Sequence, residues 1–259
     1  MNKIYKALVV VVLLLIGSQA MAQVRGALFL GAAIPQKDYA VFNNFNDFAL
    51  MSNDPDDDYA GAGVGFNVGL KWYFNVGVKG LDAIVSVDGI LNGANTKLKN
   101  AYRDSESSYA GPFVGGSFQY NATPKFINVP AMLGLNYMYH IHPNFGVFVE
   151  AGAGANLRFI LDKETVTKGY LLGMETIVKD FQYYDQAFSF AYQAGIGIEV
   201  SKNLVVGCNF YDLGAADVKG EQTIRTTTLI DNDTRTENYY NIFGSVHPIM
   251  LLGRVAFSF

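Results

Sequence analysis

Apolar side chains recur at every second position from Phe126 to Phe159, on both sides of a break at His142-Pro143-Asn144. A period of two residues is typical of a strand with one face in nonpolar surroundings. Each arm is long enough to cross a bilayer as a tilted strand, which needs about 9 to 11 residues. The stretch therefore predicts a membrane-crossing hairpin. One face of its second arm is entirely apolar: Phe145, Val147, Val149, Ala151, Ala153, Ala155, Leu157 and Phe159.

The same pattern recurs in eight segments, and an even number is typical of single-chain bacterial outer-membrane barrels. Short connections at 75–79, 141–144 and 201–202 alternate with long polar ones at 36–61, 93–125, 162–187 and 214–247. This rhythm predicts an all-β fold: an eight-stranded antiparallel up-and-down transmembrane β-barrel with short periplasmic turns and long extracellular loops. The predicted strands are Val24 to Pro35, Ala62 to Phe74, Gly80 to Asn92, Phe126 to His140, Phe145 to Leu161, Phe188 to Val200, Asn203 to Leu213 and Pro248 to Phe259.

The outward faces of these strands contain no charged residue, although 16% of the chain is charged. Arg or Lys facing lipid near the midplane costs about 2 to 4 kcal/mol, which explains this exclusion. A soluble β-barrel or sandwich, the alternative fold, tolerates polar residues on its outer face. Aromatic residues near both strand ends form candidate interfacial girdles: Trp72, Phe74, Tyr137, Tyr139, Phe159, Phe188 and Phe190.

The inward faces contain four basic and four acidic residues. An eight-stranded barrel leaves an interior that side chains fill, so unpaired charges there are costly. We expect a Lys71 to Asp82 contact across the first hairpin and a central cluster of Arg254, Glu150 and Asp88. Structural filling is favoured over a proton or ion path. The predicted lumen charge network comprises Arg25, Lys71, Asp82, Asp88, Glu150, Arg158, Glu199 and Arg254.

The N-terminal segment differs from the rest of the chain. Lys3 and Lys6 precede an apolar run that ends at Ile16, and small residues follow up to Ala22. This pattern predicts a secretory signal peptide at 1–22, because the run is too short to remain as an anchor. The barrel domain then spans 23–259.

Charge and cysteine content exclude other classes of function. Without Lys3 and Lys6 the chain has 17 basic (19 − 2) and 23 acidic residues, a formal charge of −6, so nucleic acid is not an expected partner. Cys208 is the one cysteine, which excludes an internal disulfide, and metal-binding Cys/His spacing is absent. We expect no cofactor and no metal site. Asp54 to Asp58 lacks the Gly and Glu of a calcium loop and is interpreted as a solvated acidic loop.

Three short motifs and the C-terminus resemble known barrels. The motifs Phe126-Ile-Asn-Val-Pro130, Leu133-Gly-Leu-Asn-Tyr137 and Ala151-Gly-Ala-Gly-Ala155 precede a closing Gly253-Arg-Val-Ala-Phe-Ser-Phe259. They resemble the PorT-like and OmpX-like outer-membrane barrel families. The resemblance implies location in the outer membrane of a Gram-negative bacterium, in contact with its lipid. It also implies that Val255, Phe257 and Phe259 form the signal read by the barrel-assembly machinery.

Several functions fit this architecture. We favour a non-enzymatic membrane anchor whose extracellular loops bind protein partners, and the resemblance to PorT adds an accessory role in a secretion or motility apparatus. The segment from Thr223 to Phe243 is expected to form a hairpin beyond the membrane, and OmpX-like proteins expose such a sheet edge. A rim enzyme would depend on His247 with Asp212 or Asp217, whose spacing matches no catalytic pattern. A small pore is disfavoured by the charged interior.

Overall fold

Eight strands form a closed barrel in the computed structural model, which describes residues 24–44, 48–50, 59–109, 114–119, 123–171, 174–201, 203–229 and 234–259. Every neighbouring pair is antiparallel, and the order around the barrel is β1-β13-β10-β9-β6-β5-β3-β2. The predicted barrel is confirmed. Its strands are β1 (Val24–Gln36), β2 (Gly65–Asn75), β3 (Leu81–Asn92), β5 (Phe126–His142), β6 (Phe145–Ile160), β9 (Ala187–Val200), β10 (Leu204–Asp212) and β13 (Ile249–Ser258).

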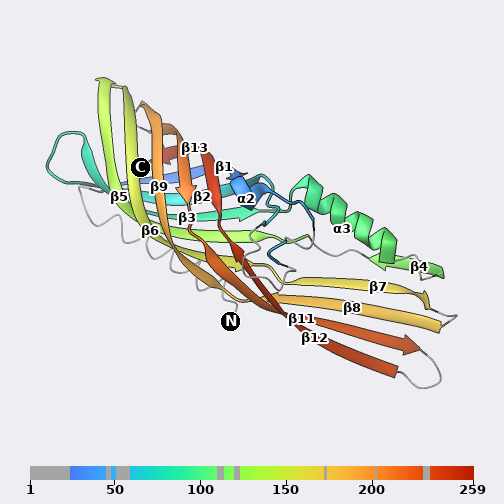
Figure 1. Cartoon of the computed structure of the whole chain (residues 1–259). Coiled ribbons are helices and arrows are strands. Elements are labelled where there is room, and N and C mark those ends of the chain that lie inside the picture. The colour runs from blue at the N-terminus through green and yellow to red at the C-terminus, as the bar shows by residue number, and fades with distance from the viewer. Residues whose placement is uncertain are drawn as a thin grey trace.

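Five further strands form a second sheet beyond one end of the barrel (Figure 1). They are β4 (Val114–Gln119), β7 (Lys163–Leu171), β8 (Met174–Tyr184), β11 (Ala216–Leu229) and β12 (Thr234–Val246), and we call them the protruding sheet. Its order, β12-β11-β8-β7-β4, repeats the barrel order β13-β10-β9-β6-β5. Each protruding strand is therefore next in sequence to the barrel strand that has the same place in the order.

The protruding sheet corrects the sequence-based prediction. The connections at 93–125 and 162–187 were expected to be loops, and only the last connection was expected to contain a hairpin. The structure instead places β4, β7 and β8 in these connections. It confirms the hairpin, because β11 pairs with β12 from Ala216↔Val246 to Thr228↔Thr234. The loop from Asp54 to Asp58 lies outside the described residues.

Two helices, α2 (Lys37–Ala40) and α3 (Thr96–Tyr109), lie at the end of the barrel next to the protruding sheet, which we call the loop end. Neither is long and apolar enough to span a membrane, and the same holds for every helix among the described residues. The segments around them close this end with buried apolar side chains, including Tyr39, Phe42, Phe48 and Leu98. These residues pack in one cluster with inward residues of the strands, such as Phe126.

The opposite end, with the tight connections, is the turn end. A second apolar cluster fills the barrel there and includes Phe29, Tyr73, Ile84 and Phe148. Buried polar residues occupy the level between the two clusters. The interior thus has an apolar cluster toward each end, with the buried Lys71, Asp88, Glu150 and Arg254 between the clusters and further charges near the two ends.

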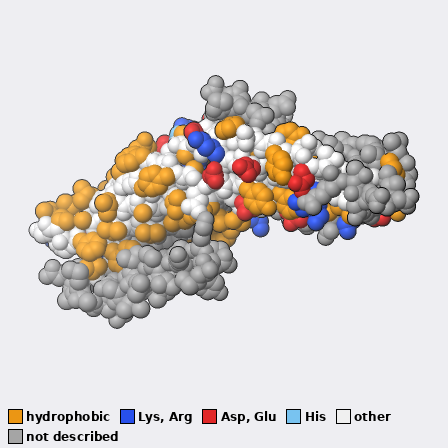
Figure 2. All heavy atoms as spheres, turned by 90° about the horizontal axis from the view of Figure 1, so that it is seen from below, with side chains coloured by type: hydrophobic (Ala, Val, Ile, Leu, Met, Phe, Trp, Pro, Cys, Tyr) orange, Lys and Arg blue, Asp and Glu red, His pale blue; other side chains and the backbone are white. Residues whose placement is uncertain are grey.

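The barrel exterior is apolar where it is exposed. Leu133, Phe188 and Ile196 are more than 60% exposed, as expected for the outward face of the prediction. Figure 2 shows the molecule from below, relative to the view of Figure 1. Hydrophobic side chains predominate over the barrel, while acidic and basic side chains gather toward the protruding sheet. The alternation in sequence therefore separates an apolar exterior from a polar interior.

Candidate functional site

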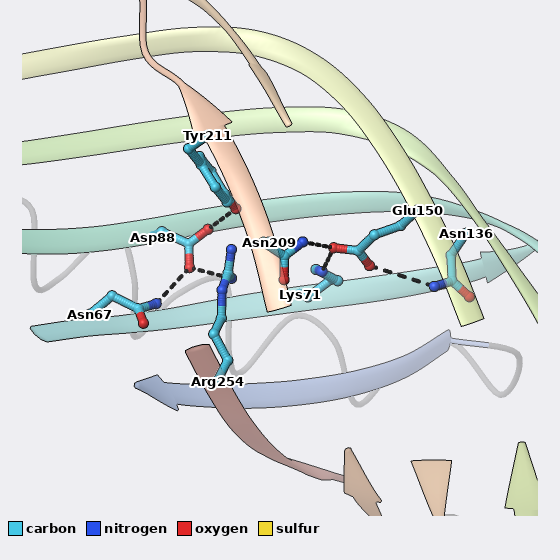
Figure 3. A network of polar contacts seen from close by, with 8 residues as sticks. All are labelled: Asn67, Lys71, Asp88, Asn136, Glu150, Asn209, Tyr211 and Arg254. Atoms are coloured by element: carbon cyan, nitrogen blue, oxygen red, sulfur yellow. Dashed lines mark hydrogen bonds and ion pairs between the residues drawn. The ribbon is translucent and has the colours of Figure 1, made fainter. Parts of the chain in front are cut away.

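The buried layer inside the barrel contains an ion pair between β2 and β6. Lys71 Nζ lies 2.5 Å from Glu150 Oε1, and both side chains are almost fully buried. Asn209 Nδ2 donates to the same oxygen at 2.5 Å, and Asn136 Nδ2 donates to Oε2 at 3.5 Å. The carboxylate of Glu150 is thus held by three donors from three other strands (Figure 3). Such partners compensate for the cost of burying both charges.

A second buried pair connects β13 and β3. Arg254 Nη1 donates to Asp88 Oδ1 at 2.9 Å. Tyr211 Oη donates to Asp88 Oδ2 at 2.8 Å, and Asn67 Nδ2 donates to Oδ1 at 3.3 Å. The guanidinium also lies over the Tyr211 ring, 4.9 Å from its centroid. Both oxygens of Asp88 therefore have hydrogen-bond donors, as do both oxygens of Glu150.

The predicted Lys71 to Asp82 contact is wrong. In the hairpin of β2 and β3, Asn75 is paired with Asp82 and Lys71 with Ser86. Asp82 is thus four residues from the position opposite Lys71 (86 − 82), about 13 Å along a strand. It lies half-buried at the turn end of β3.

The predicted central cluster is divided between the two pairs. Arg254 and Asp88 are partners, whereas Glu150 is paired with Lys71, which the prediction had assigned to Asp82. In each of the two pairs, the partners come from strands that are not neighbours in the barrel. Periodicity along a strand therefore identified inward charges but not their partners.

The remaining lumen charges lie toward the two ends of the barrel. Arg25 donates to Glu199 Oε2 at the turn end, where its guanidinium lies 4.4 Å from the centroid of Tyr73. Arg158 lies toward the loop end and is almost fully buried. Its Nη1 donates to the Val246 carbonyl at 2.6 Å, and its Nη2 donates to the Gly214 carbonyl at 3.0 Å. Arg158 thus binds backbone groups where β10 gives way to β11 and where β12 ends before β13.

These layers decide what the interior can do chemically. The charged groups inside the barrel are in ion pairs or bonded to carbonyls, and apolar clusters fill both ends. A continuous aqueous path needs a wider lumen than eight strands leave. In the described residues, buried side chains from both apolar clusters and the ion pairs between them occupy this interior.

Most of the predicted girdle residues lie on the barrel exterior. Tyr137, Tyr139, Phe188 and Phe190 are 47%, 59%, 70% and 62% exposed, whereas Phe74 and Phe159 are half-buried. Trp72 differs, because it is only 7% exposed although its register partners, Gly26 and Val85, belong to the outward face. The three residues of the predicted assembly signal are all exposed: Val255, Phe257 and Phe259.

The histidines lie at opposite ends of the barrel. His140 and His142 are exposed at the turn end, as predicted for turn-flanking residues. At the loop end, His247 Nε2 lies 2.6 Å from Asp212 Oδ1, an oxygen that also accepts from the Gly214 amide at 3.0 Å.

Of the two acidic candidates considered for a rim enzyme, the structure places Asp212 beside His247, because β10 and β13 pair and Asp212 is opposite Ile249. Rim chemistry also needs a hydroxyl within hydrogen-bond reach of the base. In the part of the chain that the structure describes, no hydroxyl bonds to His247, and Ser189 Oγ donates to the Leu213 carbonyl. Asp217 lies apart from the pair, opposite Ser245 in the protruding sheet.

The protruding sheet has two different faces. The covered face packs toward α3 and the loop-end cluster, with Val218 and Ile242 buried and Lys163 Nζ 3.9 Å from the ring centroid of Tyr102. The open face exposes aromatic side chains, among them Tyr183 at 50% and Tyr239 at 70%.

Asp180 lies on the covered face within a polar cluster. Gln222 Nε2 donates to both of its carboxylate oxygens at 3.0 Å, and Gln182 Nε2 donates to Oδ2 at 3.4 Å. Burial raises the pKa of Asp180, and the two amide donors and the charge of Lys163 oppose this shift in part. Burial also raises the pKa of Tyr184, whose hydroxyl donates to Gln182 Oε1 at 2.8 Å.

Comparison with known proteins finds structural likeness only. No family model and no curated relative matches the chain. The structure is similar to Ail of Yersinia pestis, solved with the heparin analogue sucrose octasulfate, with 11% identity, a TM-score of 0.38 and coverage of 92% of this chain and 99% of Ail.

Two further structures are comparably similar. OprG from Pseudomonas aeruginosa has 9% identity, a TM-score of 0.38 and coverage of 91% of this chain and 94% of OprG. AlkL, solved in DMPC lipid bilayers, has 14% identity, a TM-score of 0.34 and coverage of 92% and 90%. These structures are distant neighbours of the eight-stranded barrel described above. The resemblance to the PorT-like and OmpX-like families stays a prediction.

Proposed function

We propose that the protein is a non-enzymatic outer-membrane anchor that displays the protruding sheet outside the cell as a binding surface. The observation that carries this proposal is the continuation of five adjacent barrel strands into a sheet, combined with a filled barrel interior. The apolar exterior fits contact with lipid, and the closed barrel leaves no strand edge inside the bilayer. The protein's interactions are then made by the protruding sheet.

The edge strand β12 is the part of that sheet best suited to a protein partner. Among the strands that the structure describes, it has a neighbour, β11, on one side only, over thirteen residues. An exposed edge presents unpaired backbone donors and acceptors, to which an extended segment of another chain can add as a further strand. We infer strand addition at β12 as the mode of binding.

The anchoring role is tested by fractionation, gel migration and conductance. The protein is expected in the outer-membrane fraction, with a change of migration on boiling, and protease added to whole cells should cleave the protruding sheet. Planar-bilayer recordings should show no steady conductance. A large, stable conductance, or a sheet protected in intact cells, would contradict the proposal.

Strand addition is tested by photo-crosslinking from the β12 edge. A photoreactive residue at Asn238, exposed on β12, should capture a partner, while the same residue at Lys79, exposed in a turn at the opposite end, should not. An accessory role in secretion or motility, which the PorT resemblance suggests, predicts capture of components of that apparatus. Equal capture from both positions would exclude β12 as the binding edge.

A further inference from the structure

A hollow lies on the barrel exterior near the turn end, where β5, β6 and β9 run side by side (Figure 1). Its volume is about 440 Å³, and we call it the β6 groove. None of the side chains that shape it is charged, and the hydroxyls of two tyrosines are the only polar groups among them. These side chains are Tyr137 and Tyr139 on β5, Val147 and Val149 on β6, and Ile196 and Ile198 on β9.

Strand register explains the shape of the groove. Tyr139, Val147 and Ile198 lie opposite one another in one row across the three strands. Tyr137, Val149 and Ile196 form the next row in the same way. Residues that are directly opposite in antiparallel strands point to the same face. In each row the valine of β6 is the smallest side chain, so the valines form a floor between a wall of tyrosines and a wall of isoleucines.

The groove belongs to the part of the exterior that faces lipid. Its walls stand out from the barrel, with Tyr139 59% and Ile196 64% exposed. Tyrosine, with an apolar ring and a polar tip, is typical of the level where membrane meets water. The next outward row away from the turn end is Leu135, Ala151 and Ala194, which is entirely apolar. The groove therefore leads from the interface into the hydrocarbon core.

A hollow at this level is filled by a flexible apolar group. Left empty, its lining would lose the dispersion contacts that neighbouring atoms provide. Water is a poor occupant, because an ordered water needs about two to four polar partners and the floor and the isoleucine wall offer none from their side chains. A lipid acyl chain is apolar and bends to fit. It contacts the floor and both walls of the groove, whereas a flat stretch of the exterior touches a chain on one side only.

Shape, not hydrophobicity, is what gives the groove a preference for one chain. Apolar surface is surrounded by equally apolar lipid everywhere in the hydrocarbon core, so burial alone does not favour one place over another. The additional van der Waals contacts with the two walls do. A chain held there should exchange with the surrounding lipid more slowly than chains elsewhere around the barrel.

We propose that the β6 groove binds one acyl chain of a phospholipid from the membrane leaflet at the turn end. Val147 and Val149 form the floor of this site. The leaflet is the periplasmic one if the protruding sheet is displayed outside the cell, so that part of the assignment rests on the proposed function. Binding of an acyl chain does not depend on it.

The site is tested by native mass spectrometry of the full-length mature protein, purified from outer membranes in a mild detergent. One phospholipid, identified by its mass, is expected to remain bound. Val149→Phe places a ring on the floor of the groove and should lower the retained fraction about tenfold, as expected for the loss of about ten carbon contacts. Phospholipids that have the same chains but different headgroups should be retained equally, because the groove contacts the chain.

The matched control is Val68→Phe, the same substitution on the outward face of β2, where Val68 is 42% exposed. It should change the retained fraction less than twofold. Equal loss in both variants, or no phospholipid bound to the unmodified protein, would refute the proposal. A dimer that Val149→Phe dissociates would assign the groove to a second copy of the chain, and retention of lipopolysaccharide in place of phospholipid would assign it to the other leaflet. Either result would also overturn the proposal, whereas fractionation and conductance test the anchoring role separately.

Discussion

Lys71 and Glu150 form an ion pair that spans the barrel interior, with 2.5 Å between Nζ and Oε1. Their strands, β2 and β6, are separated in the barrel by β3 and β5, so the pair bridges strands that share no backbone hydrogen bonds. Both side chains are almost completely buried. The two side chains meet only in the closed barrel. The electrostatic energy of the ion pair therefore depends on closure of the barrel.

Replacing one partner of this pair should be more damaging than replacing both. Lys71→Met leaves the Glu150 carboxylate buried without its main partner, and such a loss costs about 3 to 5 kcal/mol. The variant Lys71→Met/Glu150→Leu should recover most of that stability, because no unpaired charge remains. Urea unfolding of the protein in lipid vesicles, followed by gel migration, measures both effects.

The control for this comparison is Lys79→Met, which replaces an exposed lysine in the turn between β2 and β3. It should change the free energy of unfolding by less than about 0.5 kcal/mol. A double variant that is as unstable as Lys71→Met would show that the ion pair itself, rather than the unpaired charge, determines the stability.

A second prediction concerns Arg158, which donates to the carbonyls of Val246 and Gly214. Arg158→Met removes both bonds where the barrel meets the protruding sheet. Amide hydrogen exchange should become faster around Gly214 and Val246, while the turn-end half of the barrel keeps its protection. Each lost bond to a charged donor is worth about 1.5 to 3 kcal/mol.

Arg25→Met is a suitable comparison for Arg158→Met, because Arg25 pairs with Glu199 at the opposite end of the barrel. Its exchange effects should be confined to the turn end. If Arg158→Met changed exchange evenly over the whole chain, its role at this junction would be refuted.

The sequence predicted a strand correctly where its two faces differ in polarity. The barrel strands alternate between apolar and polar residues, so the sequence predicted how many strands form the barrel and which side chains point outward. The predicted strand ends lie within three residues of the observed ones. The segment Lys163–Leu171 has Lys163 and Thr165 on one face and Glu164 and Lys168 on the other. With polar residues on both sides, it gave no periodic signal and was interpreted as a loop.

The candidate site was predicted only in part, for a geometric reason. The alternation of side chains along each strand identified four inward residues, and all four are buried: Lys71, Glu150, Asp88 and Arg254. Which of them meet depends on how the strands are staggered when the barrel closes, and a hairpin in isolation does not contain that information. Lys71 was for this reason assigned to Asp82 on the adjacent strand.

A third prediction follows from the raised pKa of Asp180. A carboxyl whose pKa is higher in the folded than in the unfolded state binds its proton more tightly when folded. Its contribution to stability is present below the ordinary carboxyl pKa and is lost as pH rises through the raised value. Asp180→Asn should therefore slow hydrogen exchange in β8 and β11 at neutral pH and weaken the pH dependence of that exchange.

The comparison for Asp180→Asn is Asp217→Asn, which changes an exposed carboxylate on the open face of β11. Exchange in β8 and β11 should be unchanged in this variant. Faster exchange in Asp180→Asn at neutral pH would mean that the hydrogen bonds from Gln222 outweigh the burial of the charge.

The last prediction uses two glycines of the barrel strands. An added Cβ at Gly134 would collide with the Ala151 carbonyl oxygen and with Gly152 Cα, whereas one at Gly253 would meet nothing within 4 Å. Backbone atoms of a paired strand cannot move aside as a flexible side chain can. Gly134→Ala should therefore cost about 1 to 3 kcal/mol through overpacking, while Gly253→Ala should be tolerated. Urea unfolding in lipid vesicles distinguishes the two, and equal stability of both variants would show that β5 and β6 can separate without loss of pairing.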